Sequence, residues 1–96
     1  MNQSLRHYLT SVVAEDVKRE VDRSEEQYGP LHSLHEGLAV LREEYSKLEQ
    51  EIFWGARKSG NTDGVRLGAL QVAAMGMRIV MMISPVPVDL PDEAVG

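Results

Sequence analysis

The stretch from Leu67 to Ile83 is apolar almost throughout, and Gln71 and Arg78 are its only strongly polar side chains. A helix that is apolar on nearly all sides has to be covered on nearly all sides. In a chain of 96 residues the cover has to come from other helical stretches, from a second copy of the chain, or from lipid. A membrane-spanning helix needs about 20 apolar residues, whereas this run is shorter and contains an arginine. We therefore expect a buried helix and no membrane segment.

Small residues mark one face of this predicted helix. Ala69, Ala73 and Gly76 follow each other at steps of four and three, which places them on the same side. We expect a neighbouring helix to approach closely along that side, because small side chains leave room for it.

A first amphipathic helix is predicted near the start of the chain. Its apolar positions recur at steps near 3.6 residues and are Leu5, Leu9, Val12, Val13, Val17 and Val21. Ser4 is the expected N-cap. Gly29 and Pro30 end the helix, because glycine terminates helices and proline disfavours the α conformation of the residue before it. The helix should span about 22–25 residues.

A second helix is predicted to begin at a capping box formed by Ser33 and Glu36, in which each side chain bonds the backbone amide of the other. Its apolar residues step by four and three in a heptad-like stripe and are Leu34, Leu38, Leu41, Tyr45, Leu48 and Ile52. Such a stripe is expected to pack against nearly parallel or antiparallel helices. The helix should end near Phe53–Gly55.

The segment 56–64 is rich in Gly, Ser, Asn and charged residues, and it predicts a flexible loop. Three polar residues near its end are candidates to cap the third helix, namely Asn61, Thr62 and Asp63.

The third helix is expected to run to about Ser84, because Pro85 and Pro87 block its continuation. Residues 1–84 then form one domain, and residues 85–96 form a Pro-rich acidic tail that is expected to be extended or disordered. The predicted fold class is all-α, with three long helices in a bundle. Because three helices cannot easily bury an all-apolar member, we expect homo-oligomerisation to complete the bundle, as a homodimer or homotetramer with the third helix central.

Composition narrows the partners of the chain. The formal net charge is −5, which argues against nucleic acid, because phosphate binding needs a positive field. The chain contains no cysteine, so neither a disulfide nor a thiolate metal site can stabilise so small a domain. Oligomerisation is the remaining common way to stabilise a domain of this size. The first ten residues lack the apolar core of a signal peptide, and a cytoplasmic location is expected.

The acidic residues of the second helix are the main candidates for chemistry, and they are Glu36, Glu43, Glu44, Glu49 and Glu51. Several fall on faces adjoining the apolar stripe, from which carboxylates could reach an interhelical groove. Carboxylate oxygens suit Mg²⁺ or Mn²⁺. The alternative is that Lys47, three or four residues from several of them, forms ordinary surface ion pairs worth about 0.3–0.5 kcal/mol each.

Arg78 is the most conspicuous polar residue of the apolar helix, and a buried arginine normally has a partner. Three partners are open: a carboxylate of another helix, solvent at the edge of a groove, or a phosphate of a ligand.

Two strings carry a resemblance. The segments YGPLHSLHEGLAVLREEYSKLEQEIF and VRLGALQVAAMGMRIV, joined by a Gly-containing polar loop, resemble small phage and bacterial proteins of the MazG-like, all-α nucleoside triphosphate pyrophosphohydrolase superfamily. The similarity covers roughly residues 15–83. It implies a helical bundle that assembles as a dimer or a dimer of dimers. It also implies Mg²⁺ (or Mn²⁺) held by two acidic motifs, with hydrolysis of a nucleoside triphosphate to a monophosphate and pyrophosphate.

The resemblance places the metal site on positions that only partly match. Glu43 and Glu44 correspond to the acidic pair opening the first motif, and Lys47 stands where its second glutamate is expected. Gly68 and Gln71 stand at the later acidic positions. Two functions follow from the resemblance. One is a MazG-like pyrophosphohydrolase with weakened or lost activity. The alternative is a catalytically lapsed helical oligomer that serves as a binding or regulatory module.

Overall fold

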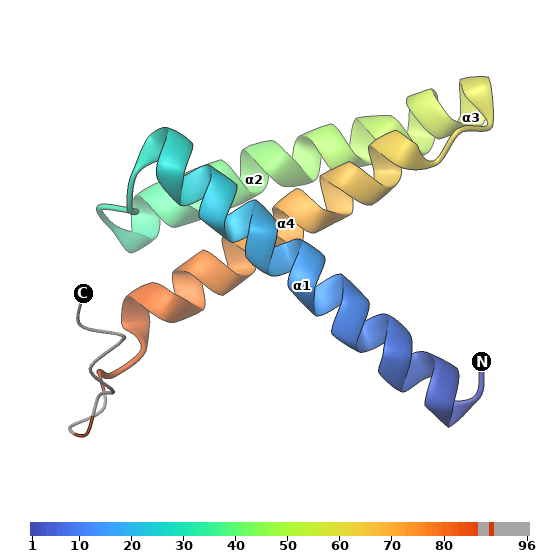
Figure 1. Cartoon of the computed structure of the whole chain (residues 1–96). Coiled ribbons are helices and arrows are strands. Elements are labelled where there is room, and N and C mark those ends of the chain that lie inside the picture. Colours follow the sequence, from blue (N-terminus) through green and yellow to red (C-terminus); the bar gives the residue numbers. More distant parts are fainter. Residues whose placement is uncertain (87–88, 90–96) are drawn as a thin grey trace.

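The computed structural model describes residues 1–86 and 89, and every regular element among them is helical. The elements are α1 (Gln3–Tyr28), α2 (Leu34–Gln50), the π-helix η1 (Glu51–Gly55), α3 (Ala56–Ser59) and α4 (Asp63–Ile83). The predicted all-α class with three long helices is confirmed (Figure 1). Most of the predicted tail, residues 85–96, lies outside the described residues.

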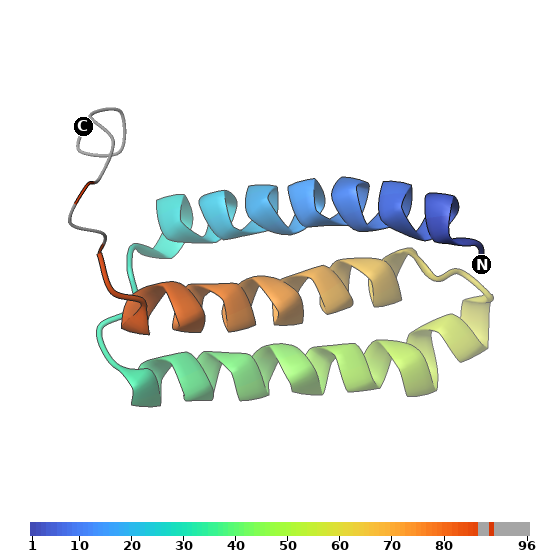
Figure 2. The same cartoon turned by 90° about the horizontal axis from the view of Figure 1, so that it is seen from below.

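Helix α4 lies between the other two long helices and contacts both of them (Figure 2). Helix α2 runs antiparallel to α4, whereas α1 crosses α4, and its N-terminal half projects beyond the other helices (Figure 1). The chain measures 50 × 37 × 19 Å, so it is flat. The apolar stretch thus has an amphipathic helix on each side, as its composition predicts.

Helix α1 begins two residues earlier than the sequence suggests. The side chain of Asn2 accepts a hydrogen bond of 2.7 Å from the Leu5 amide, so Asn2 is the N-cap and the prediction of Ser4 is wrong. Asparagine caps helices at least as well as serine, and it lies three residues before a free amide. The helix ends at Gly29, whose φ of 78° few other residues adopt.

Half of the predicted capping box is present at the start of α2. The Ser33 hydroxyl accepts a 3.0 Å hydrogen bond from the Glu36 amide, as expected. The Glu36 carboxylate, however, accepts a hydrogen bond from the backbone N–H of His32, at 3.1 Å, and not from that of Ser33. The carboxylate is also 3.0 Å from the His32 ring nitrogen Nδ1, and this second contact favours the hydrogen bond to His32 over one to Ser33.

The predicted loop 56–64 is wrong over its first half. The chain stays helical through η1 and α3 to Ser59, where Gly60 takes a left-handed conformation with φ of 74°. Alanine, arginine and lysine at the start of this segment are good helix formers, so the polar composition does not break the helix. Only residues 60–62 connect to α4, and the Asn61 side chain accepts a 2.9 Å hydrogen bond from the Asp63 amide.

The core of the chain is small. The buried hydrophobic side chains are Val17 and Val21 of α1 with Ala74 and Met75 of α4. None of the described side chains is large and fully buried. A single chain therefore leaves most of its apolar surface exposed to solvent.

The close approach between α2 and α4 occurs at Gly37 and Gly68. A Cβ atom at Gly68 would lie 3.4 Å from the Cα atom of Leu48, and one at Gly37 would lie 3.0 Å from the Ile79 side chain. Both glycines are buried. A larger residue at either position would hold α2 and α4 farther apart.

The predicted small-residue face of α4 is uncovered within one chain. Ala69 and Ala73 are exposed, and nothing lies within 4 Å of a Cβ placed on Gly76. Helix α4 is rotated so that Gly68 meets α2, while Ala74 and Met75 are buried in the core. A helix of a second copy could still approach the face of Ala69, Ala73 and Gly76, so that prediction stays a prediction.

The apolar stripe of α2 is only partly covered. Leu41 and Leu48 are half-buried, but the remaining members stay about half exposed and are Leu34, Leu38, Tyr45 and Ile52. Within one chain, the predicted packing of the stripe against an antiparallel helix is therefore found for only part of its length. The side of α2 that faces α4 includes Gly37 and Leu48 and is rotated away from the centre of the stripe.

By length and composition, helix α4 could cross a membrane. Of the 18-residue segment of α4 that meets this test, 22% is buried in the structure. A core helix of a soluble protein meets the same test.

Candidate functional site

A groove of about 700 Å³ lies between the C-terminal half of α1, the middle of α2 and α4. We call it the three-helix groove. Its charged lining residues are Glu20, Arg23, Glu36, Glu43, Glu44, Lys47 and Arg78. A volume of this size falls within the range of small-molecule sites, which is about 300–1,000 Å³.

The groove collects most of the positions that the sequence singles out. Glu43, Glu44 and Lys47 reach it from α2, and Gln71 reaches it from α4. Gly68 is not among the lining residues, because it packs against Leu48 at the α2–α4 contact.

Glu44 occupies an unusual position in the groove. Its side chain is only 18% exposed, and its Oε2 atom is buried without a hydrogen-bond partner. The other oxygen, Oε1, lies 3.7 Å from the Lys47 ammonium nitrogen. A buried carboxylate oxygen without a partner costs free energy, and a bound donor or cation would remove that cost.

The other acids of α2 do not converge on Glu44. Glu43 and Glu49 are exposed, and Glu36 bonds to His32. The Glu51 carboxylate lies against Gly55 and Gly64, where a Cβ atom on either glycine would meet it. Gly64 belongs to the first turn of α4, and a carboxylate is stabilised by the dipole at a helix N-terminus.

The residues of one chain do not fit the magnesium site that the resemblance implies. Within residues 1–86 and 89, no three His, Asp or Glu side chains lie close enough together to hold a metal ion. Glu44 offers one free oxygen, but the Lys47 ammonium lies beside it and repels a divalent cation. Mg²⁺ is usually held by at least one or two carboxylates, so this donor set is poor.

The wall formed by α1 has its own ion pair. The Arg23 Nε donates a 3.1 Å hydrogen bond to Glu20 Oε1, and the Arg23 Nη1 donates one of 2.7 Å to Gln27. The hydrogen bond to Glu20 is the main cause of the raised pKa of Arg23, and the charge of Glu44 across the groove contributes to it. Arg23 therefore stays cationic and faces the Glu44 carboxylate.

Arg78 is buried, and a carboxylate of another helix is indeed among its partners. Its Nε donates a 3.0 Å hydrogen bond to Glu25, its Nη1 donates one of 2.7 Å to the Ser24 hydroxyl, and its Nη2 donates one of 2.8 Å to the Gly29 carbonyl. We call this set of contacts the Arg78 latch. Because its three nitrogens bond to Glu25, Ser24 and Gly29, Arg78 fixes the position of α1 against α4.

The contribution of α1 to the groove could not be found by the search for acidic motifs. Glu20, Arg23 and Ser24 resemble ordinary surface residues of an amphipathic helix. One signal was present, because Ser24 continues the apolar face through Val17 and Val21 at helical spacing. A polar residue on a buried face requires a polar partner, and here the partner is Arg78.

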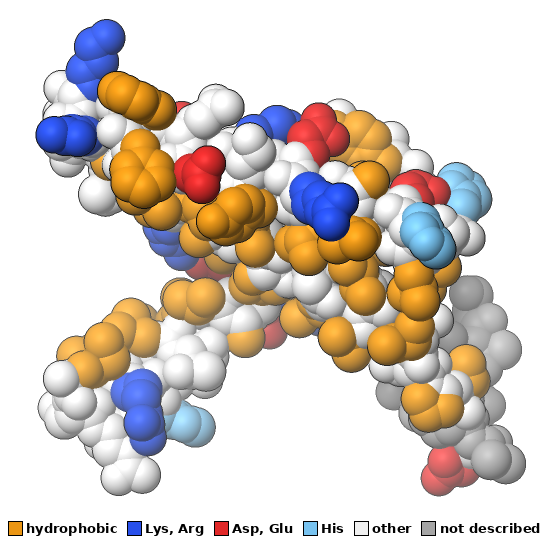
Figure 3. Space-filling model, turned by 180° about the vertical axis from the view of Figure 1, so that it is seen from behind, with side chains coloured by type: hydrophobic (Ala, Val, Ile, Leu, Met, Phe, Trp, Pro, Cys, Tyr) orange, Lys and Arg blue, Asp and Glu red, His pale blue; other side chains and the backbone are white. Residues whose placement is uncertain are grey.

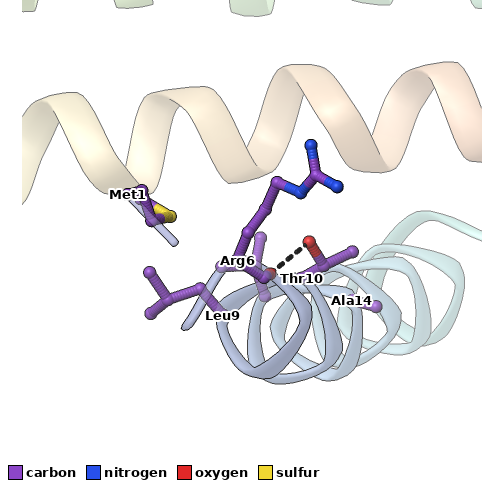
Figure 4. Close-up of a pocket in the computed structure, with 6 residues that line it drawn as sticks. Met1, Arg6, Leu9, Thr10 and Ala14 are labelled. Carbon is purple, nitrogen blue, oxygen red and sulfur yellow. Dashed lines mark hydrogen bonds between the residues drawn. The ribbon is translucent and has the colours of Figure 1, made fainter. Parts of the chain in front are cut away.

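A second hollow of about 470 Å³ lies beside the projecting half of α1 (Figure 4). Its lining is apolar apart from Arg6 and Thr10, and the Thr10 hydroxyl donates a 2.7 Å hydrogen bond to the Arg6 carbonyl. It contains no acid or base that could act on a substrate, so the three-helix groove is the better candidate.

We expect Glu36 to titrate below the ordinary range of a glutamate. The hydrogen bond from the His32 backbone lowers its pKa, and the His32 ring contributes further. Because the pKa of Glu36 is lower in the folded chain than in the unfolded chain, its ionised form stabilises the fold at a pH above the unfolded-state pKa. This stabilisation is lost as the pH falls through the folded-state pKa. In NMR titrations, His32→Ala should raise the pKa of Glu36 only in part, since the backbone bond remains. No change of that pKa would show that the ring makes no contact in solution.

Comparison of the chain with protein-family models, curated proteins and solved structures gives no match.

Proposed function

We propose that this chain is a MazG-like protein that binds a nucleoside triphosphate in the three-helix groove. We propose further that its hydrolysis of the nucleotide to a monophosphate and pyrophosphate, which Mg²⁺ or Mn²⁺ would support, is weakened or lost. The observation that carries the proposal is the Glu44 carboxylate, which has a buried oxygen without a partner inside a groove of suitable size. The all-helical fold agrees with what the sequence resemblance implies.

Lys47 is the reason to expect weakened activity. A second carboxylate would attract a divalent ion, whereas the ammonium group 3.7 Å from Glu44 repels it. At about 4 Å and an effective dielectric constant near 20, two unit charges interact by about 4 kcal/mol. Lys47 is 60% exposed, so solvent screening reduces this figure considerably.

The proposal is tested by calorimetric binding and pyrophosphate release with a panel of standard and modified nucleoside triphosphates, each in Mg²⁺ and in Mn²⁺. We expect binding of at least one nucleotide. Glu44→Gln should weaken that binding by about tenfold, because it replaces a carboxylate whose buried Oε2 can accept a hydrogen bond from the base or sugar of the nucleotide with a neutral amide.

Glu26→Gln is the matched control, since Glu26 is an exposed glutamate beside the groove that does not line it. It should change the affinity by less than about twofold, as is usual for an exposed charge. Equal effects of the two substitutions would place the site elsewhere, and no binding of any nucleotide would refute the proposal.

A second candidate function is a catalytically lapsed helical module with a binding or regulatory role. The contact between Lys47 and Glu44 favours it, because the ammonium takes up charge that a metal would otherwise neutralise. Nucleotide binding without pyrophosphate release from any member of the panel would support this candidate over a weakened hydrolase.

We also propose that homo-oligomerisation completes the helical arrangement into a bundle in the cytoplasm. The exposed apolar side chains on all three long helices support this, since water is an unfavourable neighbour for such a surface. A second copy would cover α4 without a membrane.

A further inference from the structure

The exposed part of the α2 stripe forms a continuous seam. Its members lie at steps of four, seven and seven residues, are 51%, 45%, 57% and 48% exposed, and are Leu34, Leu38, Tyr45 and Ile52. We call this set the α2 seam. A spacing of seven residues keeps side chains on one side of a helix over several turns. A second helix lying along α2 could therefore contact all four.

The chain has more surface than a compact monomer of its mass. Its accessible surface is 7649 Å², whereas a compact protein of 10.7 kDa exposes about 5,500 Å². Its radius of gyration is 15.9 Å, against about 12.5 Å for a compact domain of 96 residues. The excess of about 2,100 Å² exceeds the roughly 800 Å² per partner that a standard stable interface buries.

Exposed hydrophobic side chains cover a broad area of the face that Figure 3 shows. Viewed from behind, hydrophobic side chains extend along α2 and continue towards the projecting part of α1 and the end of α4 (Figure 3). The molecule is only 19 Å across its thinnest dimension, so a second layer of helices can lie on this side.

We propose that a second copy of the chain packs on this side, with the two α2 seams antiparallel to each other across a two-fold axis. This inference rests on the proposed homo-oligomerisation, and it adds the surface and the orientation. Apolar side chains at heptad spacing pack best against another helix with the same spacing, and α2 of a second copy is such a helix. A two-fold axis brings the same patch of both copies together, so one seam suffices for a closed dimer.

Charges beside the seam favour the antiparallel orientation. Arg42 and Glu49 lie on the flank of α2 that faces away from α4, and within the described part of the chain neither forms an ion pair. Antiparallel packing pairs this flank with itself, so that Arg42 comes beside Glu49 of the partner subunit. Parallel packing pairs it with the other flank, which includes Gly37 and Glu44 and already faces α4 and the groove, so that flank offers no partner for these two charges.

The test is sedimentation equilibrium of the full chain and its variants. The wild type should sediment at twice its 10.7 kDa. Tyr45→Lys, at the middle of the seam, should raise the dimer dissociation constant by at least about tenfold. Ser46→Lys is the control, because Ser46 is exposed on the same helix and follows Tyr45 directly but is not part of the α2 seam. It should change the constant by less than about twofold.

The orientation is tested by charge reversal. Arg42→Glu should weaken the dimer by about threefold or more, and adding Glu49→Arg should restore the wild-type constant to within about twofold. Both residues are exposed, so these variants retain the fold even if Tyr45→Lys does not, as helix content by circular dichroism would show.

The outcomes separate the two proposals. A wild-type monomer would refute both the homo-oligomer and the seam. An oligomer that Tyr45→Lys leaves intact, or that Ser46→Lys disrupts equally, would refute the seam alone. Failure of Glu49→Arg to rescue Arg42→Glu would refute the antiparallel orientation.

Discussion

Arg78→Met should destabilise the fold by about 3 kcal/mol, the low end of the range for breaking a buried ion pair. The substitution keeps the apolar stem of the side chain but leaves the Ser24 hydroxyl and the Gly29 carbonyl without their partner. Glu25 is one-third exposed and can turn towards water, which moderates the loss. The measurement is urea unfolding followed by circular dichroism.

Arg19→Met serves as the control for this experiment. Arg19 lies on the same helix as Ser24 but is 76% exposed, and its ion pair with Asp16 joins residues three apart on one helix. Its loss should change the free energy of unfolding by about 0.5 kcal/mol or less. If the two variants were equally stable, the Arg78 latch would contribute nothing to the attachment of α1.

Gly68→Glu should destabilise the fold by about 3 kcal/mol, the upper end of the range for overpacking. The new Cβ would lie 3.2 Å from the Leu48 side chain and 3.4 Å from its Cα, so α2 and α4 would have to move apart. The carboxylate would also enter a buried position. Although the resemblance expects an acid near this position, the substitution should not create a metal site.

Ala69→Glu is the matched control, because it places the same side chain on the next residue, which is exposed. Its effect on urea unfolding should stay within about 0.5 kcal/mol. If Gly68→Glu proved as stable as Ala69→Glu, the two helices would be packed less closely than the structure indicates.

The helices themselves could be predicted from the sequence because their signals are local. Hydrophobic periodicity locates the three long helices, and Gly29 and the Ser33 cap place the turn between the first two. The boundary after α2 was missed, because the polar residues that follow Gly55 favour a loop by composition but a helix by propensity. Only Gly60, with its left-handed conformation, ends the helical run.

The orientation of the helix faces could not be predicted in the same way. A periodic stripe shows that a face is apolar, but it does not show whether the cover comes from the same chain or from another. The α2 stripe and the small face of α4 both predict contacts with other helices, and within one chain both are largely exposed. The contacts that do form depend on single positions such as Gly37 and Gly68, where the fit of two surfaces matters more than periodicity.

The candidate site was predicted on α2 and α4 and missed on α1. Glu44, Lys47 and Gln71 do share a groove, but the third wall carries Glu20 and Arg23, which no motif marks. Their role depends on how α1 crosses α4, and that crossing is fixed by residues more than 45 positions apart in the sequence. Local patterns do not contain such information.

The crossing of α1 also has a consequence for access to the groove. Helix α1 is held by few buried apolar side chains and by the Arg78 latch, and the same helix supplies one wall of the groove. A ligand that touches all three walls gains affinity only while α1 is docked, so its binding and the docking of α1 reinforce each other by the same free energy. A substitution that weakens the Arg78 latch would therefore also weaken the binding of such a ligand.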